Sequence, residues 1–64
     1  MCLSTIYKVN SEGSELFAKN IQNVVNDENT GELRFRDIMG IEYVLKGTIT
    51  NIDLIGNTIN VAAD

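Results

Sequence analysis

Residues 32–46, ELRFRDIMGIEYVLK, contain two runs in which hydrophobic and polar side chains alternate, with a glycine between them. A period of two is typical of a half-buried β-strand, whereas an amphipathic helix repeats its hydrophobic residues every three or four positions. We therefore expect two neighbouring strands, 32–37 and 41–46, each with one face on the core and the other in water. The side chains expected to face the core are Leu33, Phe35, Ile41, Tyr43 and Leu45.

Similar short segments lie on both sides of this stretch and are separated by polar or glycine-containing turns. Further strands are expected at 2–9, 15–19, 21–26, 47–54 and 58–62, with turns at 10–14, 27–31 and 38–40. Ile49 and Ile52 are three positions apart and cannot share a face of a regular strand, so we expect a bulge near Asn51. The pair Gly56-Asn57 is expected to form a tight hairpin turn.

Two local interpretations stay open. A helix competes for residues 12–26, where the hydrophobic spacing is partly helical, although three asparagines there compete for backbone hydrogen bonds. The first strand can alternate in two ways. In one, Cys2 faces outward toward a partner; in the other, Ile6 is the core residue, Cys2 lies on the core side, and a site at an interface is disfavoured. The side chains that face inward in the first phase are Leu3, Thr5, Tyr7 and Val9.

The chain of 64 residues has room for one domain, 1–64. Several short strands with glycine turns predict an all-β fold, a small and strongly bent antiparallel barrel of six to seven short strands, SH3-like or Sm-like. A core of this size supplies only about 3–5 kcal/mol of stability unless a disulfide, a metal or a partner subunit adds to it. With one cysteine the chain can form no internal disulfide. With no histidine besides, one subunit cannot hold a metal through several soft side chains, so we expect a homodimer.

Composition also limits the function. Without histidine there is no Ser-His or Cys-His pair, and the glycines form no phosphate-binding loop, so we expect no enzyme. Nine acidic and five basic residues give a net charge of −4, which disfavours binding to nucleic acid and to anionic membranes. No apolar run could span a bilayer and no signal peptide is evident, so we expect the protein in the cytoplasm.

A binding module for RNA or for another protein is the alternative function. Its contacts would be Arg34, Arg36 and Lys46. A platform for single-stranded nucleic acid needs exposed aromatic rings beside such charges. The alternation instead directs Phe35 into the core, away from both arginines, so ordinary surface arginines are the simpler interpretation.

Cys2 is the chemically distinctive side chain. A lone cysteine is commonly a small buried hydrophobe, and that interpretation stays open here. However, the Cys2 sulfur, the Cys2 amide nitrogen and the terminal amine, on Met1 if it is retained, lie within chelating reach of one metal ion. Two such sets across a two-fold axis would give planar sulfur and nitrogen ligands, which suit Ni(II) or Cu(II) rather than tetrahedral Zn(II). Cu(II) tends to oxidise thiolates, which favours nickel.

The sequence also resembles the CooT family of small nickel-binding proteins over essentially its whole length. The resemblance is carried by Met1–Tyr7, the acidic turn with its glycine, the segment 16–25, Lys46-Gly47 and Ile52–Leu54. It implies an SH3-like β fold and a homodimer with one Ni(II) bound at its interface through Cys2. It also implies an accessory role, a metallochaperone that delivers nickel to carbon monoxide dehydrogenase. Members of this family have also been labelled predicted RNA-binding proteins.

Overall fold

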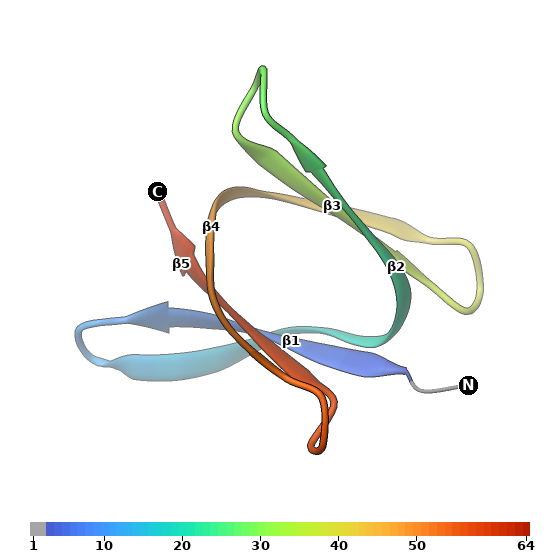
Figure 1. The fold of residues 1–64 in the computed structure, drawn as a ribbon, viewed down its shortest axis with the longest axis horizontal. Coiled ribbons are helices and arrows are strands. Elements are labelled where there is room, and N and C mark those ends of the chain that lie inside the picture. The colour runs from blue at the N-terminus through green and yellow to red at the C-terminus, as the bar shows by residue number, and fades with distance from the viewer. Residues whose placement is uncertain (1–2) are drawn as a thin grey trace.

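A computed structural model describes residues 3–64, which form five β-strands that close into a barrel (Figure 1). The strands are β1 (Ser4–Asn10), β2 (Gly13–Asp27), β3 (Glu32–Asp37), β4 (Glu42–Asp53) and β5 (Thr58–Ala63). Each strand pairs antiparallel with the next, and β5 pairs parallel with β1 to close the ring. The predicted small all-β barrel is therefore confirmed, but it has five strands, and one of its pairings is parallel rather than antiparallel.

Two of the predicted strand boundaries do not exist. The segments 15–19 and 21–26 are one continuous strand, β2, which turns a corner at Asn20 with a φ of 57°. Asparagine adopts this left-handed conformation more readily than other side-chain-bearing residues, so it allows the corner without ending the strand. The helical interpretation of residues 12–26 is wrong, because residues 13–27 belong to β2.

The segments 41–46 and 47–54 likewise merge into one strand, β4. Gly47 lies in this strand because a Cβ atom at that position would come within 2.5 Å of the carbonyl oxygen of Ala62 on β5. The predicted bulge is confirmed: the register shifts between Ile49, opposite Val61, and Asn51, opposite Asn60.

The turn between β4 and β5 differs from the predicted two-residue hairpin. Strand β4 ends at Asp53, which pairs with Thr58, so the turn contains four residues, 54–57. Its left-handed residue is Asn57, with a φ of 56°, rather than Gly56. The turn is therefore longer, and it carries two hydrophobic residues, Leu54 and Ile55, into its tip.

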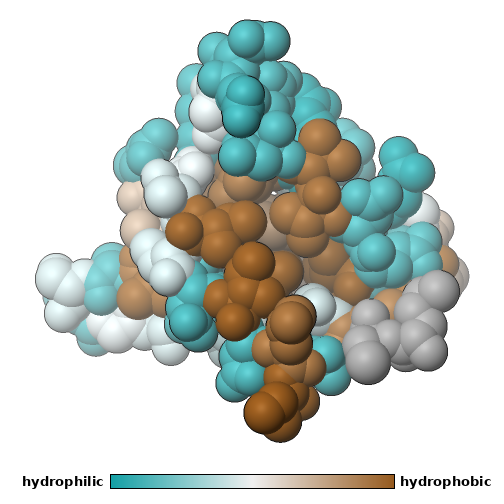
Figure 2. Space-filling view, viewed as in Figure 1, coloured by the Kyte–Doolittle hydropathy of each residue, from teal (hydrophilic) through white to brown (hydrophobic). Residues whose placement is uncertain are grey.

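The core contains Phe35 and Leu33, as predicted, and both are almost completely buried. Tyr43 and Leu45 are half-buried against it, whereas Ile41 is 53% exposed because β4 begins only at Glu42. The buried hydrophobic side chains are Ile6, Ala18, Ile21, Leu33, Phe35, Ile59 and Val61. Hydrophobic side chains also reach the surface over β4 and at the end of the β4–β5 hairpin (Figure 2).

Strand β1 uses Ile6 as its core residue, and its neighbours Thr5 and Tyr7 are half-buried. This settles the phase at Ile6. The pairing of β1 with β2 shifts register between Ser4 and Ile6, where two steps along β1 are matched by three along β2, so the extra residue lies in β2. Ile6 belongs to the phase for which we expected Cys2 on the core side; Cys2 itself lies outside the described part of the chain.

Candidate functional site at the start of β1

The start of β1 lies between two turns of the barrel. The amide of Thr5 donates a hydrogen bond to the carbonyl oxygen of Asn57, in the β4–β5 turn, across 2.9 Å. Ser4 pairs with Ile21 on β2, and Ile21 in turn pairs with Asp37, which begins the β3–β4 turn. Both turns therefore lie beside the strand that follows Met1 and Cys2, two residues that are themselves outside the described range.

The two turns share one sequence pattern, Asp-apolar-apolar-Gly, at residues 37–40 and 53–56. In the first, Oδ1 of Asp37 accepts hydrogen bonds from the amides of Met39 and Ile41, at 2.9 and 3.0 Å. In the second, Oδ1 of Asp53 accepts hydrogen bonds from the amides of Ile55 and Gly56, at 3.0 and 2.9 Å. Hydrophobic periodicity does not single out this repeated pattern, although it is visible in the sequence.

The apolar pair in each turn points into solvent. The exposed fractions are 50% and 79% for Ile38 and Met39, and 81% and 97% for Leu54 and Ile55. The acidic residue of each turn holds the backbone in place, and no other charged residue lies between positions 37 and 40 or between 53 and 56. Each turn therefore presents hydrophobic side chains on a hydrogen-bonded frame.

Asp37 is the one buried charged side chain among residues 3–64, with an exposed fraction of 6%. Besides the two amides, its Oδ2 accepts a hydrogen bond from the Tyr43 hydroxyl across 3.1 Å. This hydrogen bond raises the pKa of Tyr43 above 10.0, and partial burial and the charge of Asp37 act in the same direction. Asp37 is therefore a structural anchor for the β3–β4 turn. Its three hydrogen bonds explain how a buried carboxylate is tolerated in so small a core.

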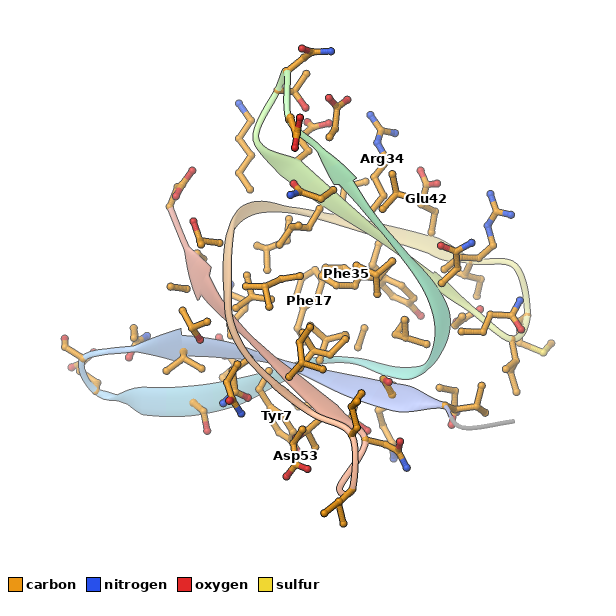
Figure 3. All side chains as sticks on the ribbon, viewed as in Figure 1. Tyr7, Phe17, Arg34, Phe35, Glu42 and Asp53 are labelled. Atoms are coloured by element: carbon orange, nitrogen blue, oxygen red, sulfur yellow. The ribbon has the colours of Figure 1, made fainter. Side chains whose placement is uncertain are left out.

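The arginines of the alternative nucleic-acid site lie on the outer face of β3, and Lys46 follows on β4 opposite Glu32. Figure 3 shows Arg34 beside Glu42, outside the barrel, and Phe35 pointing inward toward Phe17. Arg34 forms ion pairs with Glu32, at 3.0 Å, and with Glu42, at 3.5 Å. Its guanidinium charge is thus matched by two carboxylates, and the Phe35 ring is buried rather than available for stacking.

Residues 3–64 contain no cluster of three or more acidic, cysteine or histidine side chains that could hold a metal ion. The metal ligands expected from the sequence, Met1 and Cys2, precede that range. No helix in the same range has the length and apolar character needed to cross a bilayer.

The fold defines a small, closed five-stranded β-barrel. The family model of the CO dehydrogenase accessory protein CooT matches residues 1–62. The chain therefore belongs to the CooT family, and the predicted resemblance is confirmed.

A crystal structure of a candidate CooT from Carboxydothermus hydrogenoformans has the same fold. It superimposes with a TM-score of 0.88 at 24% sequence identity, and the match covers 98% of each chain. None of the curated proteins matches the chain.

Proposed function

We propose that this chain binds Ni(II) as a homodimer and delivers it to CO dehydrogenase, acting in the cytoplasm, where an unpaired thiol stays reduced. The observation that carries the proposal is the position of Cys2, two residues before β1, in a chain of the CooT family. The absence of any other metal-binding cluster from residues 3–64 supports the same locus.

The proposed ligands are the Cys2 thiolates of both subunits, completed by the Cys2 amide nitrogens or by the Met1 amines where Met1 is retained. Thiolate and deprotonated amide donors in a plane favour Ni(II) and Cu(II) over Zn(II). Nickel is the cargo in this proposal, and one ion is bound per dimer. These 64 residues contain no histidine that could bind further ions.

The small core supports the homodimer. Within residues 3–64, seven buried hydrophobic side chains form it, and a domain of about 60 residues buries only roughly 60% of the surface that its unfolded chain exposes. Neither an internal disulfide nor a metal site within residues 3–64 adds to its stability. A second subunit would supply the missing buried surface.

The test is a Ni(II) titration of untagged protein, with mass and metal content measured on the same sample. We expect one Ni(II) per two chains, with thiolate-to-metal charge-transfer absorption, and loss of both in Cys2→Ser. The matched control, Cys2→Ser/Ser4→Cys, keeps one thiol per chain but moves it two positions away from the terminal amine, so the chelating set of thiol, amide and amine is lost and nickel binding should weaken. If Cys2→Ser binds nickel as tightly as the parent protein, the proposal is wrong.

A further inference from the structure

The tip of the β4–β5 hairpin displays the two most exposed large hydrophobic side chains of residues 3–64. Leu54 is 81% exposed and Ile55 is 97% exposed. Figure 2 shows this end of the hairpin as a projecting hydrophobic tip, below a hydrophobic surface over β4. Large exposed apolar patches on a small domain are typical of interaction sites.

The tip is held in one conformation rather than left loose. Two amides of the tip, those of Ile55 and Gly56, both donate hydrogen bonds to Asp53 Oδ1. Ordering a free loop on binding costs conformational entropy, and this loop is already ordered. Leu54 and Ile55 can therefore dock without that cost.

The hairpin is bonded directly to the start of β1. Asn57, the residue that ends its turn, accepts the hydrogen bond from the Thr5 amide at 2.9 Å. Three residues of extended chain span at most about 11 Å, so covalent geometry alone keeps Cys2 within that distance of Thr5. A metal ion that joins two Cys2 thiols would therefore hold the start of β1, to which the hairpin is hydrogen-bonded, near the two-fold axis in both subunits.

We propose that Leu54 and Ile55 are the main contact through which a second copy of this chain docks, about a two-fold axis that brings the two N-termini together. This proposal rests on the nickel site of the proposed function. In a two-fold interface the same patch faces its own copy. The turn residues 54–57 carry no charged side chain, so two copies of the tip can meet without like-charge repulsion between turn residues. A standard interface needs about 800 Å² from each partner, and the hydrophobic surface that continues from the tip over β4 supplies further area.

The continuation consists of one exposed side chain and two half-buried ones that lie against the core. Ile52 is 53% exposed and pairs with Ile59 on β5. The half-buried residues are Leu45 and Ile49. A second copy that covers the tip and these residues would complete the burial of the core from outside.

The experiment measures the molar mass of metal-free protein over a dilution series, by sedimentation, for three variants. These are the double variant Leu54→Glu/Ile55→Glu, the single variant Ile55→Glu, and the control Val25→Glu. Val25 is 51% exposed on the outer face of the barrel, opposite Arg34, so a glutamate there adds the same charge beside a cation. Ile55→Glu is included because this variant should fold as the parent does: a side chain that is 97% exposed contributes nothing to the core.

We expect Val25→Glu to dimerise as the parent does, and both hairpin variants to be folded and to have a dimer dissociation constant raised by at least about tenfold. Cys2→Ser should remain a dimer without binding nickel. If folded hairpin variants dimerise as the parent does, the hairpin proposal is wrong and the nickel site is unaffected. If the parent itself is a monomer, and the hairpin variants instead lose binding to CO dehydrogenase, the tip docks the client and the second-copy proposal is overturned.

Discussion

Tyr43 and Asp37 form a hydrogen bond, hydroxyl to Oδ2, that ties the first residues of β4 to the last residue of β3 across 3.1 Å. The same carboxylate holds the turn between the two strands through its other oxygen. The pair therefore joins a side chain of the sheet to the backbone of the turn. It makes the hydroxyl of Tyr43 a reporter of this corner of the barrel.

The first prediction concerns the titration of that hydroxyl. In the variant Tyr7→Phe, which leaves Tyr43 as the one tyrosine, the phenol should titrate with a pKa above 10.0, because its neutral form donates the hydrogen bond to Asp37. The folded state thus holds this proton more tightly than the unfolded state does. The stability that this adds is fully present below pH 10 and is lost as the pH rises through the raised pKa.

The measurement is the phenolate absorbance as a function of pH, together with thermal unfolding over the same range. The control is Tyr7→Phe/Asp37→Asn, which keeps the shape of the side chain, removes its charge and replaces the acceptor Oδ2 by an NH2 donor, so the pKa should fall back toward 10.0. Titration of Tyr43 at or below 10.0 in the Tyr7→Phe protein would contradict the prediction.

The second prediction compares the two acidic turns. Asp37→Ala should lower the free energy of unfolding by about 2–4 kcal/mol, because two amides and one hydroxyl lose a charged acceptor at a buried position. Asp53→Ala removes two comparable hydrogen bonds at an exposed turn, where water replaces the acceptor, and should cost only about 0.5–1.5 kcal/mol.

Denaturant unfolding of both variants beside the parent protein gives this comparison directly. A fold with about 3–5 kcal/mol of total stability should lose most of it in Asp37→Ala. Equal losses in the two variants would show that burial of Asp37 adds nothing to its role, and would contradict the interpretation of Asp37 as the anchor of the β3–β4 turn.

Local pattern predicted the parts of the barrel in which neighbouring strands alternate regularly. Leu33 and Phe35 were placed in the core from periodicity alone, and the spacing of Ile49 and Ile52 predicted the bulge in β4. Pattern failed where the chain changes direction without a conventional turn. The corner at Asn20 depends on a left-handed conformation that asparagine tolerates but does not require, so the sequence does not distinguish it from a strand end.

The closure of the barrel and the function cannot be predicted from short stretches of sequence. The parallel pairing of β1 with β5 joins the two ends of the chain, and no short-range pattern encodes it. Composition directed attention to Cys2, whereas the choice of nickel comes from membership of the CooT family. The sequence predicts Leu54 as the end of a strand and assigns Ile55 to no element. The protrusion of this pair follows from the four-residue turn that Asp53 holds, which the local pattern does not reveal.

The third prediction tests the close approach of β5 to β4 at Gly47. A Cβ atom there would lie 2.5 Å from the carbonyl oxygen of Ala62 and 3.0 Å from Cα of Ala63, so Gly47→Ala must push β5 away from β4. Overpacking of this kind costs about 1–3 kcal/mol, and a backbone obstacle cannot move aside as a flexible side chain does. The variant should unfold at lower denaturant concentration than the parent.

Thr48→Ala is the matched control, because Thr48 is the next residue of β4, is exposed, and pairs with Ala62 itself. Its stability should stay within about 0.5 kcal/mol of the parent. Hydrogen exchange locates the strain: in Gly47→Ala the amide of Asp64, which donates to the Lys46 carbonyl at 3.0 Å, should exchange faster, whereas amides of the β2–β3 pair should not. Uniform acceleration across all strands would instead indicate a global loss of stability, without a local displacement of β5.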